Sequence, residues 1–324
     1  MAGSIGEWWM WAGFAGLVLS LLAVDLLAFG GGRAHKVRAR EALVWCVAWM
    51  TLALSFAAVM WWYLDTTGGR DVANEKTLEF VAGYLIELSL SVDNMFVFLM
   101  IFRYFVVPAE YQRRVLLYGV LGAIAMRAVM ILLGVWLVAK FSWILYLFGL
   151  LVLVTGIKML IFAEHKPDLE RNPVLGWLRR HLRVTASFQQ ERFFTIKEGI
   201  RYATPLFLVL VLIETSDLVF AVDSIPAIFA VTTDPFIVVT SNIFAIMGLR
   251  ALYFLLADME GRFVLLKYGV ALVLVFVGVK LLAANWFHVP IIVSLAVVGT
   301  ILFVSVMLSM WRSGVVKRAE IEKA

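Results

Sequence analysis

The chain has 324 residues, of which 63% are hydrophobic and only 16% are charged, and its formal net charge is +5. Soluble globular domains carry about 25% charged residues. This composition, with its repeated long apolar runs, excludes a soluble domain and indicates a polytopic membrane protein. The positive charge does not indicate nucleic-acid binding, because Lys and Arg gather in short segments between the apolar runs, where they act as topology signals.

Nine apolar windows are long enough to cross a bilayer. A membrane offers the backbone no hydrogen-bond partners and no short alternating segments occur, so each window is predicted to be a helix and not a barrel strand. The N-terminus lacks a basic region and a small-residue cleavage pattern, so the first helix is expected to stay as an anchor. The predicted spans are 8–30, 42–64, 80–102, 115–139, 142–163, 204–231, 236–256, 263–284 and 289–311.

The loops between these spans alternate in charge. The loop after the first span ("GGRAHKVRARE"), the loop after the third, the long loop 164–203 and the tail 312–324 are basic, whereas "DTTGGRDVANEKTLE" after the second span is net acidic. Lys140, in a tight turn, is the one exception. The positive-inside rule therefore predicts an external N-terminus, with the long loop and the C-terminus in the cytoplasm, and we expect a bacterial inner-membrane protein.

The long loop contains "NPVLGWLRRHLRV" at 172–184. On a helix, Leu175, Leu178 and Leu182 share one face, and the arginines lie largely on the other. This pattern fits either an interfacial helix on anionic lipid or a solvated basic linker with one helical turn.

Two of the spans carry the same acidic motif. In "YLIELSLSVDNMFVFLMIF" (84–102) Glu87 precedes Asp93 by six residues, and in "LIETSDLVFAVDSIPAIFAV" (212–231) Asp217 precedes Asp223 by six. A small polar residue follows each second Asp, and "IAMRAVMILLG" (124–134) likewise resembles "AIMGLRALYFLLA" (245–257). "GIKML" (156–160) resembles "GVKLL" (278–282). The motifs and their basic residues (Arg127, Arg250, Lys158, Lys280) recur in one order, which predicts an internal repeat.

The third span enters the membrane from outside and the sixth from the cytoplasm, so the two repeats are predicted to be inverted. Inverted repeats are typical of secondary transporters, whose sites lie near the midplane between the repeats. The predicted fold is therefore an all-α polytopic membrane protein with a single transmembrane domain. Its parts are a first repeat (80–163), the cytoplasmic basic loop (164–203), an inverted second repeat (204–284), a last helix (289–311) and a tail (312–324).

Charged side chains inside the membrane are expected to have a functional or structural role, because placing each one there costs roughly 2.5–3.5 kcal/mol of free energy on insertion scales. The spans place six acids and four bases in the membrane, and six minus four leaves two negative charges, which one divalent cation would neutralise. A shared proton, or an interfacial position of Asp25, would change this balance. The acids are Asp25, Glu87, Asp93, Glu214, Asp217 and Asp223, and the bases are Arg127, Lys158, Arg250 and Lys280.

The polar side chains near these acids offer oxygen ligands. Hard cations such as Mn²⁺, Mg²⁺ and Ca²⁺ prefer such ligands, whereas zinc and copper sites usually contain His or Cys. Na⁺ or H⁺ stays open as the driving ion. The single cysteine, Cys46, excludes an internal disulfide, and the four histidines lack metal-ligand spacing. The neighbouring polar residues are Asn94, Ser89, Ser91, Ser216, Ser224 and Asn242.

Helical geometry restricts a shared site. Glu87 and Asn94 are seven residues apart and share a face, but Asp93 lies about 120° around an ideal helix from Glu87. Both acids could bind one ion only if the helix is interrupted, and "LSLS" and "DSIP" are the predicted interruptions. In the alternative interpretation, the acids form ion pairs with the four intramembrane bases and hold the bundle together.

At "ELSLSVDNMFVF" and "ETSDLVFAVDSIPAIFAV" the sequence resembles the TerC family of integral membrane proteins, in particular its Alx-type branch. The resemblance covers nearly the whole chain and implies membership of the LysE-like exporters, with manganese efflux as the activity. Carried over by position, the implied metal-binding residues are Glu87, Asp93, Asn94, Glu214, Asp217, Asp223 and Ser224. Further ligands or charge partners would be Asp25, Ser91, Asn242, Arg127, Lys158, Arg250 and Lys280.

The residues predict a secondary transporter of a hard divalent cation, without an organic cofactor and without enzymatic activity, and the resemblance implies that it exports Mn²⁺; we expect coupling to protons. The open alternatives are Ca²⁺ or Mg²⁺ transport, and a non-transporting factor for membrane-protein assembly or tellurite resistance. An intramembrane metalloenzyme ranks last, because the sequence contains no HExxH motif, nucleophile motif or phosphate-binding loop.

Overall fold

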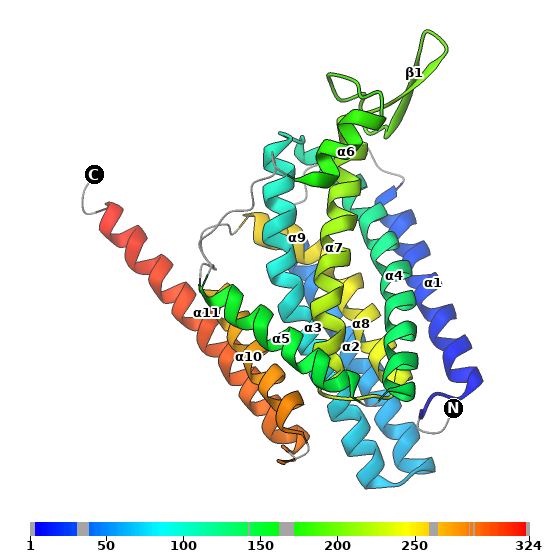
Figure 1. Ribbon diagram of the computed structural model, residues 1–324, viewed down its shortest axis with the longest axis vertical. Coiled ribbons are helices and arrows are strands. Elements are labelled where there is room, and N and C mark those ends of the chain that lie inside the picture. The colour runs from blue at the N-terminus through cyan, green and yellow to red at the C-terminus, as the bar shows by residue number, and fades with distance from the viewer. Residues whose placement is uncertain are drawn as a thin grey trace.

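The computed structural model describes residues 4–30, 39–141, 143–161, 172–258, 265–284, 286–287 and 289–321, and it is helical apart from one hairpin (Figure 1). The helices are α1 (Trp8–Gly30), α2 (Ala39–Thr67), α3 (Arg70–Tyr104), α4 (Ala109–Lys140), α5 (Ile144–Ile161), α6 (Pro173–His181), α7 (Pro205–Phe229), α8 (Pro235–Met247), α9 (Leu249–Asp258), α10 (Leu266–Ala283) and α11 (Ile291–Ile321). The strands are β1 (Phe194–Lys197) and β2 (Ile200–Ala203).

The prediction of an all-α polytopic membrane protein is confirmed. Within the described residues, eight helical segments are long and apolar enough to cross a membrane, and α1 adds a shorter apolar segment at Trp8–Val24. The predicted span 236–256 is not one regular helix, because it changes from α8 to α9 at Gly248, whose N–H bonds back to Ala245 O at 3.2 Å.

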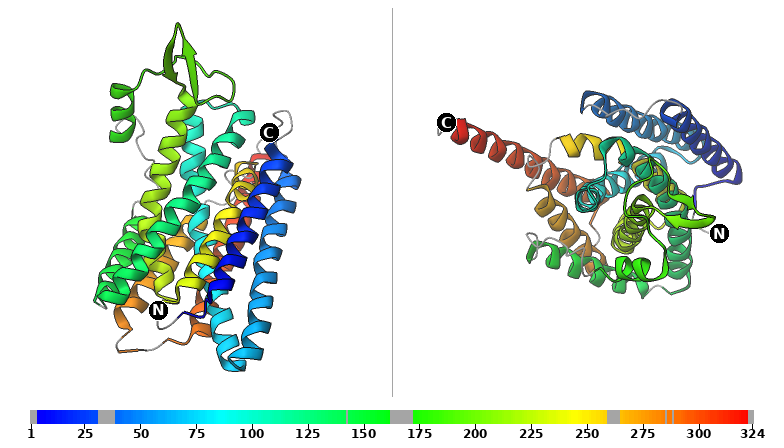
Figure 2. Two further views of the ribbon diagram at one scale, coloured as in Figure 1. Left: turned by 90° about the vertical axis from the view of Figure 1, so that its right-hand side faces the viewer. Right: turned by 90° about the horizontal axis from the view of Figure 1, so that it is seen from above.

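The central helices of the bundle are α3 and the α8–α9 pair. In the most apolar stretch of α3, 67% of the residues are buried, and in that of α8–α9, 89% are buried. In the most apolar stretch of α11, only 17% of the residues are buried. Figures 1 and 2 show α1 and α2 on one flank of this centre and α10 and α11 on another. The apolar outer faces therefore belong to the flanking helices, and the polar residues of α3 and α8 are enclosed.

Helix α5 packs against α10 through a glycine from each predicted repeat. A Cβ added at Gly278 would lie 2.6 Å from Leu153 N, and one at Gly156 would lie 2.8 Å from Val275 N. Likewise α3 packs on α8 and α4 packs on α7. A two-fold axis that exchanges α3 with α7, α4 with α8 and α5 with α10 would turn each of these pairings into another of them or into itself. The inversion of the two repeats stays a prediction.

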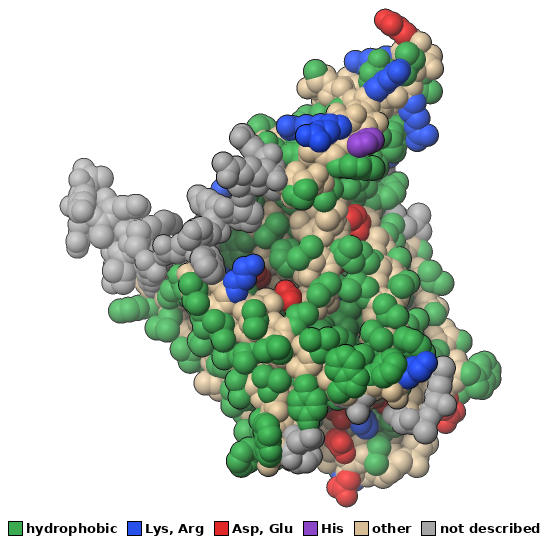
Figure 3. Space-filling view, viewed as in Figure 1, with side chains coloured by type: hydrophobic (Ala, Val, Ile, Leu, Met, Phe, Trp, Pro, Cys, Tyr) green, Lys and Arg blue, Asp and Glu red, His purple; other side chains and the backbone are tan. Residues whose placement is uncertain are grey.

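The described part of the long loop, residues 172–203, is folded rather than a simple linker. Asn172 caps α6 by accepting hydrogen bonds from Val174 N and Leu175 N, and the buried Leu175 and Leu178 pack on the protein's own core. The β1–β2 hairpin, which the sequence analysis missed, turns at Gly199 with φ of 78°. Figure 3 shows Lys and Arg side chains gathered at this end, above a largely hydrophobic surface.

The glycine contact between α5 and α10 gives a first prediction. Gly278→Ala should destabilise the protein by about 1–3 kcal/mol, because the added methyl group meets the backbone of Leu153, which no rotamer change can relieve. Sodium dodecyl sulfate titration in mixed micelles, followed by tryptophan fluorescence, measures the effect. The control is Gly299→Ala on α11, where a Cβ has no neighbour within 4 Å. Equal stability of both variants would contradict the packing.

Candidate functional site

The two helices that carry the acidic motifs are continuous, and the predicted interruptions at "LSLS" and "DSIP" are wrong. Helix α3 runs unbroken through Ser89 and Ser91, and the hydroxyl of Ser89 donates to Leu85 O within its own helix. Pro226 lies in the last turn of α7, where its missing N–H removes one hydrogen bond without ending the helix. Glu87 and Asp93 consequently project in different directions, and so do Asp217 and Asp223.

The first polar group of the bundle centres on Arg127 of α4. Its guanidinium forms an ion pair with Glu87 of α3, and its Nη2 lies 3.1 Å from Asp217 Oδ1 on α7. Nη1 also donates to Asn242 Oδ1 on α8 at 3.1 Å and lies 3.4 Å from Ser224 Oγ. All five residues are buried. We call this set (Arg127, Glu87, Asp217, Ser224 and Asn242) the arginine cluster.

The arginine cluster changes the interpretation of the predicted metal ligands. Glu87, Asp217 and Ser224 surround a guanidinium, which is planar, always charged and suited to bonding two carboxylates at once. The contacts of these residues agree with the alternative interpretation, in which intramembrane acids form ion pairs with intramembrane bases. The cluster joins four helices, and its ion pairs have no solvent to compete with them.

The second polar group lines a cavity of about 370 Å³ between α3, α5, α7 and α10. Asp93 and Asn94 enter it from α3, and Asp223 enters it from α7. The hydroxyl of Thr155 on α5 donates to Asp223 Oδ1 at 3.0 Å, and Lys158 completes the polar lining. The remaining wall is apolar (Leu90, Met159, Phe220, Val270 and Leu274). We call this space the acidic cavity.

The acids of the acidic cavity differ from those of the arginine cluster in their partners. Neither Asp93 nor Asp223 forms an ion pair within 4.0 Å in the described part of the chain. Both side chains are partly exposed to the cavity, while the neighbouring Asn94 is buried. The carboxylates of Asp93 and Asp223 are therefore available to bind a cation in the cavity.

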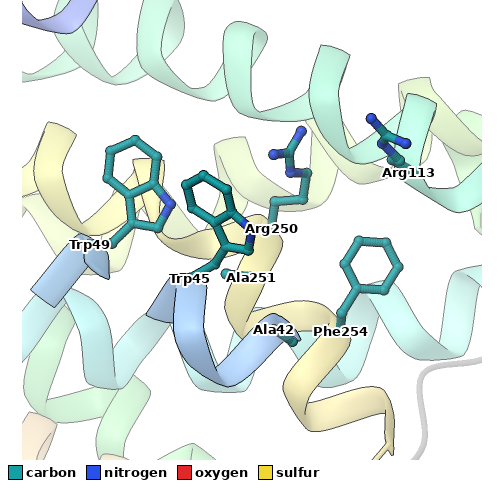
Figure 4. Close-up of a pocket in the computed structure, with 7 residues that line it drawn as sticks. All are labelled: Ala42, Trp45, Trp49, Arg113, Arg250, Ala251 and Phe254. Atoms are coloured by element: carbon teal, nitrogen blue, oxygen red, sulfur yellow. The ribbon is translucent and has the colours of Figure 1, made fainter. Parts of the chain in front are cut away.

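Glu214 belongs to neither group. It lines a small space with Asp217 and Arg250, and its carboxylate lies against Gly122 of α4, where an added Cβ would overlap the carboxylate. Arg250 also faces the other way, toward a pocket that it lines with Trp45, Trp49 and Arg113 (Figure 4). Arg127 and Arg250, which match in the two predicted repeats, thus have different surroundings.

The other predicted residues lie outside these groups. Lys280 lines a small space between α3, α10 and α11, and Ser91 is buried in α3. The hydroxyl of Ser216 donates to Leu212 O in its own helix. The side chain of Asp25, within α1, is outside the described part of the structure. Among the described residues, no three His, Cys, Asp or Glu side chains gather in a metal-binding group, so the seven predicted ligands do not form one set.

Thr155 is a site residue that the sequence analysis missed. It lies in "TGIK", and the second repeat has "VGVK" with Val277 at the matching position. This difference between the repeats was the available signal. At the end of the molecule opposite the hairpin lies Glu79, which the sequence patterns did not indicate; it pairs with Lys76 at 2.9 Å and accepts a hydrogen bond from Thr232 at 2.6 Å.

Comparison with known proteins gives one family and several long matches. The profile described as "Integral membrane protein TerC family" matches residues 72–317. The chain is 54% identical over 308 residues to Alx proteins of Shigella flexneri and Escherichia coli K12, covering 95% of this chain and 96% of theirs. The name of those relatives proposes a membrane-bound redox modulator.

A membrane protein of Myxococcus xanthus, described as uncharacterized, is 46% identical over 310 residues, covering 96% of this chain and 94% of its own. None of these names states an enzymatic activity. No solved structure matches the chain.

The arginine cluster generates the second prediction. Arg127→Met should destabilise the protein by about 3–5 kcal/mol, because it leaves two buried carboxylates without their cation. Adding Glu87→Gln and Asp217→Asn to this variant should restore part of the stability, since no buried charge then remains unpaired. Denaturation in mixed micelles measures both effects.

The matched control is Arg70→Met, which removes an ion pair with Asp65 at 2.6 Å in which the arginine side chain is 66% exposed. That substitution should cost no more than about 1 kcal/mol. If Arg127→Met were as mild as Arg70→Met, the arginine cluster would not hold the bundle.

Proposed function

Because the chain belongs to the TerC family of integral membrane proteins, we propose that it is a secondary transporter that moves Mn²⁺ out of the cytoplasm in exchange for protons. The observation that carries the proposal is the acidic cavity, in which two carboxylates from different helices face one space without an ion-pair partner. We place the transported ion there and not in the arginine cluster, where a guanidinium already holds the carboxylates.

The donor atoms of the acidic cavity suit a hard divalent cation. Asp93, Asp223, Asn94 and Thr155 offer carboxylate, amide and hydroxyl oxygens. Mn²⁺, Mg²⁺ and Ca²⁺ prefer such ligands, and a cavity of about 370 Å³ leaves room for water molecules that complete the coordination. The oxygen set supports a divalent cation as a class, and the resemblance to manganese exporters supports Mn²⁺ within that class.

The direction of transport rests on the loop charges and the resemblance. Figure 3 shows Lys and Arg side chains gathered at the end with α6 and the hairpin, so we take this end as cytoplasmic, in the inner membrane of a bacterial cell. The sequence contains no nucleotide-binding loop, so an ion gradient would supply the energy. A carboxyl group that loses its proton when the metal binds would couple the two fluxes.

A non-transporting role is the second candidate, and the folded cytoplasmic segment is the observation that favours it. Trp177 on α6 and Ile196 on β1 are 58% and 73% exposed, next to basic residues, as expected of a docking surface. A redox role, as the relatives' name proposes, would have to use a second molecule if it depended on a disulfide, because the chain has one cysteine. Ca²⁺ or Mg²⁺ remains the nearest alternative cargo.

The third prediction tests the transport site. In proteoliposomes with an imposed pH gradient, the wild-type protein should move ⁵⁴Mn²⁺, and Asp93→Asn and Asp223→Asn should each lower the initial rate about tenfold or more, since each removes one anionic ligand. The control is Asp71→Asn, at the exposed start of α3, which should transport normally.

Each variant is first shown to elute as the wild type does in size-exclusion chromatography, so that a loss of flux is not a loss of fold. If the wild-type protein moved none of Mn²⁺, Ca²⁺ and Mg²⁺ with either direction of the gradient, transport would be excluded and the docking role would take its place.

A further inference from the structure

Lys158 lies where it can reach the acids of the acidic cavity. It lines the cavity from the last turn of α5, three residues after Thr155, so the two side chains share one helix face. Thr155 is itself bonded to Asp223 at 3.0 Å. One helical turn therefore separates the base of the lysine side chain from a residue in contact with the carboxylate.

The surroundings of Lys158 contrast with those of Arg127. The guanidinium of Arg127 is buried and held by residues of three other helices. Lys158 is exposed and forms no hydrogen bond or ion pair with any described residue, although two carboxylates line the same cavity. A compact ammonium group on a flexible four-carbon stem can move between positions, whereas a planar guanidinium with several bonds cannot do so without breaking them.

The charge balance gives this mobility a use. Asp93 and Asp223 together carry two negative charges when ionised, and a transporter that has released its metal must return across a low-dielectric membrane with these charges. In the proposed exchange, a proton on one carboxyl group would neutralise one of these charges, and an ammonium group between the two carboxyl groups would offset the other. A divalent cation in the same place would repel it.

We propose that Lys158 is a tethered counter-ion of the transport site. In the structure this ammonium group lies away from both carboxylates; it swings between Asp93 and Asp223 after the metal has left, is displaced when a divalent cation enters, and so allows the metal-free, proton-carrying transporter to return. The proposal rests on the proposed function, because it assigns the acidic cavity to the transported ion.

The matching residue of the other repeat does not share this position. Lys280 lines a separate small space whose walls are mostly apolar, including Ile86, Phe276 and Val277. The hydroxyl group that Thr155 supplies is absent there, since Val277 takes its place. The counter-ion role is therefore specific to the first repeat.

The test compares two modes of flux. Purified full-length protein with Lys158→Met should bind Mn²⁺ about tenfold more tightly in equilibrium dialysis, because one competing positive charge is gone. Its net ⁵⁴Mn²⁺ uptake into metal-free proteoliposomes should fall about fivefold or more, since the metal-free site then returns without the positive charge of the lysine. Exchange of ⁵⁴Mn²⁺ against internal unlabelled Mn²⁺ should stay near the wild-type rate, because the site is then occupied in both directions.

Two further variants separate charge from fold. Lys158→Arg keeps the positive charge, so it should not show the tenfold gain in Mn²⁺ affinity that Lys158→Met shows. Lys140→Met removes a lysine that is exposed outside the acidic cavity, above the ring of Trp136, and should change neither Mn²⁺ affinity nor net uptake.

If Lys158→Met left affinity and both flux modes unchanged, the lysine would be an anchor at the membrane surface and the proposal would be overturned. A parallel loss of net uptake and exchange would overturn it too. A wild-type protein that neither binds nor moves a divalent cation would instead refute the proposed function, and this inference with it.

Discussion

The arrangement of the central helices depends on one buried interaction, the guanidinium of Arg127 with the carboxylates of Glu87 and Asp217. It ties α4 to α3 and α7, and through Asn242 to α8, and all four side chains are buried. Separating any of these helices would leave an ionised group in a low-dielectric interior, which costs far more than losing an apolar contact. The interaction therefore specifies how the central helices meet.

This interaction also decides which acids stay available for function. One guanidinium engages Glu87 and Asp217, and the rotation of about 120° between motif positions turns Asp93 and Asp223 away from it. These two acids face a cavity whose other walls are apolar, and α5 contributes Thr155 and Lys158 to the same space. A cation held by two carboxylates, Arg127, and one without an ion pair to any described residue, Lys158, thus lie in neighbouring regions of the bundle.

The close approach of α5 and α10 makes the acidic cavity possible on the side opposite α1 and α2. Gly156 and Gly278 let the two backbones approach, as small residues do between membrane helices. Bulkier residues at these positions would push α5 outward and carry Thr155 away from Asp223. The packing of α5 against α10 therefore sets the position of one of their hydrogen-bond donors.

The sequence by itself determined the membrane class, the apolar windows, the recurring charged residues and the oxygen-only ligand chemistry, because each depends on composition or on spacing along one segment. It also indicated that Glu87 and Asp93 could not share an ion on a regular helix. Only the tertiary structure decided that α3 and α7 are unbroken, which acids meet Arg127 and which line the acidic cavity. Spacing sets the angle between two side chains on one helix, but the direction in which that helix faces depends on how it packs against its neighbours, and no local pattern records that.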